Sequence, residues 1–239
     1  MSFLALRTEK LLASLTTSSY RRALFKGVLP TIEHRPALKG REFDCIIDIG
    51  ANKGQFATFA RKCFPQCRIV SFEPLDRPAR IYNSLFRNDT RTKLVQAAVG
   101  TERGSLLMHV TAKDDSSSPL AIGKLQTQAF GTVVIDTLEV PCGPLSDYLR
   151  NDDLGQKNLL KVDTQGFELQ VLRGAEGLLD RFSAIYCELS FVELYVGQPL
   201  ASEVIAYLFH RQFRLAGVYN ITSARNLGAL QADMLFIRG

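Results

Sequence analysis

The chain of 239 residues (26.6 kDa) is 46% hydrophobic and 22% charged, with a mean hydropathy near zero. This composition is typical of globular proteins with a large buried core, and it excludes a disordered, collagen-like or coiled-coil chain. No apolar run approaches the roughly 18 residues that span a bilayer. Charged residues also interrupt the apolar pattern of the N-terminus, which argues against a signal peptide. These features predict a cytoplasmic protein.

The net charge of +5 is unevenly distributed along the chain. Residues 1–41 carry eight lysines and arginines against two glutamates, a net charge of +6, so the remainder carries −1. Apolar residues recur in this segment at helical spacing: Leu4, Leu11, Leu12, Leu15, Leu24, Phe25, Val28 and Leu29. The pattern predicts a basic amphipathic helical extension (1–41) before a main domain (42–239). Its basic side chains either form a solvated face or contact an anionic surface, such as a membrane, an acidic glycan or nucleic acid.

Five scattered cysteines and three separated histidines do not form a metal-ligand pattern. Neither a disulfide framework nor a zinc site is expected, and reduced cysteines in apolar runs are typical of a buried core. We therefore predict no structural or catalytic metal from these residues.

After residue 41, short β-branched runs alternate with longer amphipathic stretches. Strands are predicted at 43–49, 68–72, 93–99, 158–163, 184–189, 213–218 and 233–238. Helices are predicted at 54–64, 78–87, from 168, and at 202–211. Strands joined by helices of this length indicate right-handed crossovers, hence an α/β domain built on one mostly parallel seven-stranded sheet with helices on both faces.

Residues 104–140 break this alternation. The runs SLLMHV (105–110) and TVVIDTLEV (132–140) are strand-like, and the stretch between them is polar and serine-rich. We expect this region to be an excursion that carries a loop over the edge of the sheet.

The first predicted strand ends in a glycine turn, D-I-G-A-N-K-G at 48–54, that leads into a helix. Gly50 and Gly54 permit a tight turn and a close approach of a ligand to backbone N–H groups. The spacing differs from the G-x-G-x-x-G of dinucleotide folds, and Asp48 would repel a pyrophosphate. S-adenosylmethionine, which has a sulfonium, an ammonium and no phosphate, suits such a turn. A nicotinamide-dependent oxidoreductase is the disfavoured alternative.

Glu73 ends the second predicted strand, 19 residues after Gly54. An acid at this point of a βαβ unit can bind both hydroxyls of a ribose. Together, the glycine turn and this acid predict a nucleoside-containing cofactor at the carboxyl edge of the sheet.

Several blocks of the sequence resemble the FkbM-like S-adenosylmethionine-dependent methyltransferases. They are DIGANKGQF (48–56), SFEP (71–74), QAAVG (96–100), LLKVDTQGFELQVLRGAEGLL (159–179) and CELSFVELYVGQP (187–199). The resemblance begins near Phe43 and excludes the basic extension. It implies a class I methyltransferase fold, with strand order 3-2-1-4-5-7-6 and strand 7 antiparallel, and O-methylation of sugars or glycosylated products.

The cofactor site is then predicted to comprise Asp48, Gly50, Asn52, Gly54, Glu73 and Ala98. Lys161 and Asp163 alternate onto one face of the fourth main strand, and Glu188 ends the next strand. We predict Asp163, Glu188 and Lys161 as catalytic residues, with a carboxylate accepting or orienting the acceptor's hydroxyl proton. The alternative is a structural ion network that includes Glu168. A divalent metal between the two carboxylates is conceivable but is not part of the prediction.

Polar residues in the neighbouring loops are candidates for binding the acceptor: Ser117, Gln165, Glu168 and Tyr195. Ser117 lies in a serine run that could equally make a loop soluble, and Glu168 also suits the first turn of a helix. The predicted function is an O-methyltransferase acting on a sugar or glycosylated product, with no nucleic-acid partner. The alternative is a non-catalytic module that keeps the cofactor fold and docks through its basic N-terminus.

Overall fold

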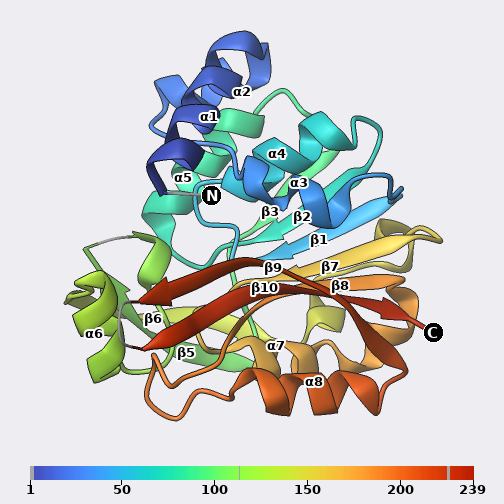
Figure 1. Ribbon diagram of the computed structural model, residues 1–239. Coiled ribbons are helices and arrows are strands. Elements are labelled where there is room, and N and C mark those ends of the chain that lie inside the picture. Colours follow the sequence, from blue (N-terminus) through green and yellow to red (C-terminus); the bar gives the residue numbers. More distant parts are fainter. Residues whose placement is uncertain (1–2, 113, 225–226) are drawn as a thin grey trace.

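The computed structural model describes residues 3–112, 114–224 and 227–239, and its main element is a twisted seven-stranded sheet (Figure 1). In spatial order the strands are β3 (Thr92–Val95), β2 (Arg68–Phe72), β1 (Cys45–Ile49), β7 (Asn158–Val162), β8 (Ala184–Ser190), β10 (Gly228–Arg238) and β9 (Phe213–Ala224). Only β10 runs antiparallel to its neighbours. This is the order 3-2-1-4-5-7-6 with strand 7 antiparallel, so the predicted fold class is confirmed.

Helices cover both faces of this sheet (Figure 1). On one face lie α3 (Arg35–Leu38), α4 (Gln55–Cys63) and α5 (Asp76–Phe86), and on the other α7 (Glu168–Gly174) and α8 (Ala201–Phe209). Short 3₁₀ turns complete the connections: η1 (Ile32–His34), η2 (Asp114–Ser116), η3 (Leu145–Asp147), η4 (Asn151–Asp153) and η5 (Glu176–Arg181).

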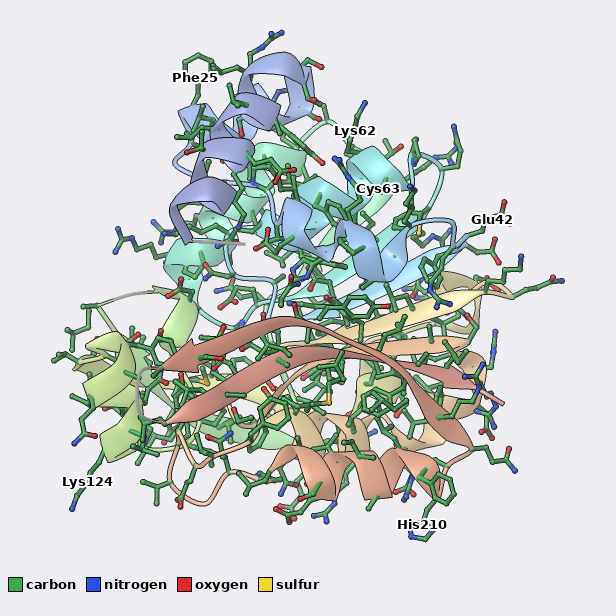
Figure 2. All side chains as sticks on the ribbon, viewed as in Figure 1. Phe25, Glu42, Lys62, Cys63, Lys124 and His210 are labelled. Atoms are coloured by element: carbon green, nitrogen blue, oxygen red, sulfur yellow. The ribbon has the colours of Figure 1, made fainter. Side chains whose placement is uncertain are left out.

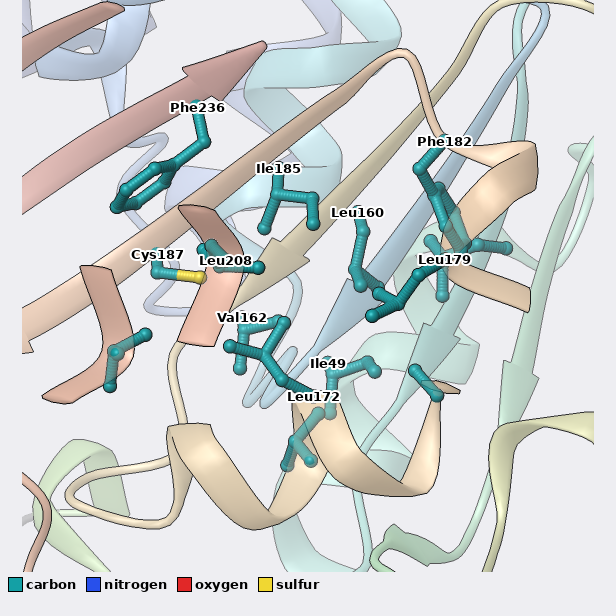
Figure 3. Packing of buried hydrophobic residues seen from close by; sticks show 14 of the residues in the cluster. Ile49, Leu160, Val162, Leu172, Leu179, Phe182, Ile185, Cys187, Leu208 and Phe236 are labelled. Carbon is teal, nitrogen blue, oxygen red and sulfur yellow. The ribbon is translucent and has the colours of Figure 1, made fainter. Parts of the chain in front are cut away.

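The apolar runs of the central strands follow from burial on both faces of the sheet. Ile46 faces the core beneath α4, whereas Ile47, the next residue along β1, faces the core over α7 and α8. Figure 3 shows the second core, where Leu160 and Val162 of β7 pack with Leu172 and Leu208 from the helices. All five residues of β1 and of β7 are buried, which places the polar Asp48 and Lys161 inside the protein.

The third predicted strand, 93–99, is wrong as a single element. The chain leaves the main sheet after Val95, and Ala98–Val99 form β4 of a second, three-stranded sheet. This sheet has the order β4-β6-β5, with β5 at Gly104–Thr111 and β6 at Val134–Gly143. Apolar residues resume at 97–99 after the single polar residue Gln96, so the pattern gave no clear sign of the change of sheet.

The region 104–140 is likewise more ordered than a loop. Both of its predicted strands are present, as β5 and β6, and the polar stretch between them includes a further helix, α6 (Lys124–Phe130). Polar residues in this stretch are not all exposed, since Gln126 of α6 is buried. The polarity of the stretch therefore favoured a loop where the chain forms a helix.

The N-terminal segment is helical as predicted, with α1 (Phe3–Thr16) and α2 (Ser18–Phe25); the side chain of Leu4 lies outside the described residues. Tyr20, Ile32 and Leu38 join the core beneath α4, so this segment packs directly on the sheet domain. The domain boundary after residue 41 stays a prediction. No helix in the described ranges is long and apolar enough to cross a membrane. The cytoplasmic location also stays a prediction.

Candidate active site

The glycine turn after β1 has the backbone geometry that its sequence predicts. Gly50 has φ +80°, and a Cβ there would lie 1.8 Å from the carbonyl oxygen of Asp163, so only glycine fits. Gly54, with φ +89°, precedes α4 and packs against the rings of Tyr82 and Phe86. The turn is thus held close to the ends of β1 and β7.

Glu73 ties this turn to the end of β2. Its carboxylate accepts hydrogen bonds from the backbone N–H of Asn52 (2.9 Å) and of Leu75 (2.9 Å). Burial raises the pKa of Glu73 from 4.5 to about 7, although these two hydrogen bonds oppose the shift. Each carboxylate oxygen retains a free lone pair, so Glu73 can still accept hydrogen bonds from a ligand.

A cavity of about 500 Å³ opens beside the turn, a volume in the range of small-molecule sites. Eight predicted site residues line it: Gly50, Asn52, Glu73, Ala98, Ser117, Lys161, Asp163 and Gln165. The other five lie behind its wall: Asp48, Gly54, Glu168, Glu188 and Tyr195. The structure therefore brings the glycine turn, the end of β2 and the end of β7 to one cavity.

Behind the wall, the pairing of β1 with β7 places Asp48 directly opposite Lys161. Lys161 Nζ lies 3.3 Å from Asp48 Oδ1 and 3.4 Å from Asp163 Oδ2. Burial by itself would lower the pKa of Lys161, but Asp163 and Asp48 raise it above its ordinary value. The cation that Asp48 contacts is therefore Lys161, not a ligand in the cavity.

Of the two carboxylates that contact Lys161, Asp163 is the one that is open to the cavity. Asp48 is fully buried, whereas the Asp163 side chain is 35% exposed and faces the cavity. Gln165 Nε2 donates to Asp163 Oδ1 (3.0 Å) and to Glu188 Oε2 (3.2 Å). Burial and the nearby Asp163 raise the pKa of Glu188 well above its ordinary value, so its neutral form is favoured. Of Asp48, Asp163 and Glu188, the carboxylate that lines the cavity is therefore that of Asp163.

The position of Gln165 also bears on whether a metal ion could bind between Asp163 and Glu188. An amide nitrogen that donates to both carboxylates occupies the position that a bridging cation would need. Across the described ranges, no group of three or more His, Cys, Asp or Glu side chains is arranged to hold a metal ion.

The remaining predicted residues support Gln165 and its loop. Tyr195 donates its hydroxyl to Gln165 Oε1 (2.7 Å), and Ser118 Oγ donates to the Gln165 carbonyl oxygen (2.7 Å). Glu168 Oε1 accepts from the backbone N–H of Thr164 (2.9 Å) and of Gly166 (3.0 Å). These contacts hold Gln165 at φ +56°, a left-handed conformation that is unusual for a residue other than glycine.

Sequence reasoning missed the contribution of the N-terminal segment. Lys10, Gly27, Leu29, Thr31, Glu33 and His34 all line the cavity. Lys10 Nζ pairs with Glu33 Oε1 at 2.6 Å, and His34 Nδ1 lies 3.2 Å from Asp233 Oδ2. The available signal was weak, since Glu33 is one of only two acids in the basic segment and His34 one of three histidines in the chain.

Several residues of the wall carry buried oxygens without a partner. Four buried side-chain oxygens there have no hydrogen-bond partner in the described part of the chain: Thr31 Oγ1, Glu33 Oε2, Asn52 Oδ1 and Gln55 Oε1. Buried acceptors without partners are costly, so the wall is suited to a ligand that brings N–H or O–H donors or a positive charge.

Residues 48–215 match a family model described as the methyltransferase FkbM domain. The 2-O-methyltransferase NoeI of Sinorhizobium fredii is 28% identical over 64% of this chain and 66% of its own. Methyltransferase 1 of Beauveria bassiana is 29% identical over 55% of this chain and 58% of its own. The matches thus span less than two thirds of the length of these relatives.

Solved structures share the fold at low sequence identity. A protein in the NADB-Rossmann superfamily from Streptococcus agalactiae superimposes with a TM-score of 0.51 at 9% identity, over 88% of this chain and 69% of that protein. Sp1610 of Streptococcus pneumoniae gives a TM-score of 0.51 at 8% identity, over 89% and 71%.

Proposed function

The chain belongs to the methyltransferase FkbM domain family, and from this premise we propose that it transfers a methyl group from S-adenosylmethionine to a hydroxyl group of a sugar or glycosylated product. At the level of the family, the predictions of a methyltransferase and of S-adenosylmethionine as the cofactor are confirmed. The activity of the whole protein, its site residues and its acceptor are the proposal.

The acceptor-rich wall supports this choice of cofactor. S-adenosylmethionine carries an ammonium, a sulfonium and two ribose hydroxyls, which match the unpartnered oxygens of Thr31, Glu33, Asn52 and Gln55. Glu73 would accept the ribose hydroxyls, and Gly50, Asn52 and Ala98 would complete the site. The bound cofactor would supply an electrophilic methyl group on its sulfonium.

One observation carries the proposed reaction: the half-exposed carboxylate of Asp163 lies on the wall of the same cavity as Glu73. Asp163 would accept the proton of the acceptor hydroxyl while the new oxygen–carbon bond forms. Gln165 fixes one oxygen of this carboxylate, and Lys161 holds the other near its positive charge. These contacts orient the Asp163 carboxylate before the acceptor binds.

A sugar hydroxyl as the methyl acceptor is a more specific proposal than the family assignment. Its support is the named activity of one relative, the 2-O-methyltransferase NoeI, together with the chemistry of Asp163. A sugar hydroxyl is a weak nucleophile until its proton is removed, so a positioned carboxylate is the group that this reaction requires.

Calorimetric titration with S-adenosylhomocysteine tests the cofactor. We expect a micromolar Kd, near −8 kcal/mol, and no binding of NAD. Binding of NAD alone would overturn the assignment.

A panel of mono- and oligosaccharides, assayed for methyl transfer, then tests the acceptor and Asp163. Asp163→Asn should lower the rate by roughly 10²- to 10⁴-fold while the affinity for S-adenosylhomocysteine changes little. Asp152→Asn is the matched control, because Asp152 is an exposed carboxylate outside the cavity. Full activity of Asp163→Asn would exclude Asp163 as the proton acceptor.

A further inference from the structure

A second pocket, separate from the proposed cofactor cavity, lies between α2 and the end of α5. Its volume is about 310 Å³, and three basic side chains line it, those of Arg22, Lys26 and Arg87, together with Ser84 and Asn88. Arg22 and Lys26 stand one helical turn apart and therefore share a face of the helix end. A small, basic and polar pocket of this kind fits an anionic group.

These three cations lack the carboxylate partners that several other basic residues of the surface have. Arg61, Arg103 and Arg211 each pair with a carboxylate, to Asp89, Asp147 and Glu176 respectively. In the described ranges, Arg22, Lys26 and Arg87 have no ion-pair partner. The helix dipole favours a cation at the C-terminal end of a helix, which holds for Arg22 and Lys26 of α2 as well as for Arg87 of α5. The dipole does not account for the fact that all three side chains line one pocket.

Exposed apolar side chains lie on α2 and on the preceding helix, α1. Phe25, between the two basic residues of the helix end, is 91% exposed, and Leu12 and Leu15 of α1 are each 59% exposed. Arg21 of α2 donates to the Leu15 carbonyl oxygen (3.0 Å), so the end of α1 lies beside the start of α2. Figure 2 shows Phe25 projecting from one end of the molecule, with Lys124 and His210 at the other.

The orientation of α2 is fixed by packing. Ala23 and Val28 are buried against Leu85 of α5, so the opposite side of α2 and its basic end face solvent. The exposure of Phe25 is therefore a property of the folded surface, and burying this ring elsewhere would require α2 to leave α5.

We propose that the α2–α5 pocket and the exposed apolar side chains of α1 and α2 dock on an anionic lipid bilayer. The basic residues would contact the headgroup charges, and Phe25 with the α1 leucines would enter the boundary of the acyl chains. A soluble polyanion would use the charges but would leave the phenylalanine and the leucines without a role. Lys10, Gly27 and Leu29 of the same segment line the cofactor cavity, so docking would bring that cavity close to the bilayer.

Sedimentation with vesicles tests the docking, with no need for methyl transfer. The full chain should bind mixed vesicles of phosphatidylcholine and phosphatidylserine. It should bind weakly to vesicles of pure phosphatidylcholine, and weakly to the mixed vesicles at high salt. The triple variant Arg22→Glu, Lys26→Glu, Arg87→Glu should lower the partition coefficient about 100-fold, at about fivefold for each basic contact. Equal binding to both kinds of vesicle, or to neither, would overturn the proposal.

Two matched controls separate docking from general charge and folding effects. Lys124→Glu, Arg173→Glu, Arg214→Glu makes the same charge change at other exposed positions and should retain most of the binding. Phe25→Ala should weaken binding several-fold with no change in Tm, whereas Phe209→Ala, which removes a ring that is 70% exposed on α8, should not. Equal losses in test and control variants would show that no specific surface docks.

Discussion

At the scale of single residues, Gly50 has no room for a side chain beside the end of β7. Gly50→Ala combines a positive φ with a Cβ 1.8 Å from the Asp163 carbonyl oxygen. We expect a loss of at least about 2 kcal/mol in the free energy of unfolding, because β1 and β7 must separate or the turn must change. Thermal denaturation measures this loss. Gly177→Ala is the control, since a Cβ there meets nothing within 4 Å, and an equal loss in both variants would contradict the argument.

The contribution of Lys161 to stability can be measured by a single substitution. Lys161→Met leaves the fully buried Asp48 without its cation, so we expect the protein to lose about 3–5 kcal/mol of stability. Lys157→Met removes an exposed pair with Glu42 and should cost less than about 1 kcal/mol.

Adding Asp48→Asn to Lys161→Met should restore at least about 1 kcal/mol, because the uncompensated charge is gone. Urea denaturation of the four proteins in this double-mutant cycle measures the coupling. An additive double variant would show that the two residues do not act as a pair.

Glu73 links the proposed cofactor site to pH. Burial raises its pKa to about 7, and only the ionised carboxylate accepts hydrogen bonds from both ribose hydroxyls. The affinity for S-adenosylhomocysteine should therefore rise about tenfold between pH 6 and pH 8, as the ionised fraction increases. Calorimetry at both pH values measures this rise. Glu73→Gln should bind more weakly and show a flatter pH profile; an unchanged slope would remove Glu73 from the site.

At the scale of elements, the region around α6 is held to the loop after β8 by two backbone hydrogen bonds. Gly123 N donates to the Leu194 carbonyl oxygen (2.8 Å), and Val196 N donates to that of Ala121 (2.9 Å). A Cβ at Gly123 would lie 2.4 Å from the Leu194 oxygen. Gly123→Val should therefore separate the two segments and lower the Tm, with little change in the affinity for S-adenosylhomocysteine. Gly131→Val, at the other end of α6 and with open space around it, tests whether disturbing α6 alone has the same effect.

The positions of the main strands and the glycine turn could be predicted because each leaves a local pattern, whereas the order of the strands was implied by the resemblance to the FkbM-like family. Short, mostly apolar runs mark strands that are buried on both faces, and D-x-G-x-x-x-G marks the turn after the first strand. The change of sheet between Val95 and Ala98 could not be predicted, since both segments are apolar and only tertiary pairing distinguishes them.

The site was predicted less completely than the fold. Asp48 and Lys161 have the residue types of a ligand site, but the register of β1 and β7 pairs them with each other. Conversely, Thr31, Glu33 and His34 belong to a segment whose charge pattern pointed to the surface, and they reach the cavity only through η1. Whether a polar residue faces a ligand or another residue depends on pairing that sequence spacing does not encode.

At the scale of the whole molecule, the N-terminal segment has two faces with different environments. One contributes Tyr20, Ile32 and Leu38 to the core and Glu33 and His34 to the cavity. The other presents the basic pocket and Phe25 to solvent. The segment is therefore part of the cofactor cavity and, by our proposal, of a membrane contact at the same time.

The buried acids of the site should also govern the stability of the whole protein. Burial raises the pKa of Glu73 and of Glu168 from 4.5 to about 7 in the folded state. At pH values between 4.5 and 7, these carboxyls keep protons in the folded state that they have lost in the unfolded state. The free energy of unfolding should therefore fall as the pH rises from 4.5 to 7. The fall is at most about 3 kcal/mol for each group, since one pKa unit corresponds to about 1.4 kcal/mol.

Urea denaturation of the wild type at pH 5 and pH 7 measures this fall, and Glu168→Gln should remove about half of it. Glutamine keeps the Oε1 acceptor for the N–H groups of Thr164 and Gly166 but cannot ionise. Glu139→Gln, at an exposed position of β6, should leave the pH dependence unchanged. A wild-type stability that rises from pH 5 to pH 7 would mean that the buried acids are ionised in the folded protein, with Lys161 and the loop N–H groups outweighing the cost of burial.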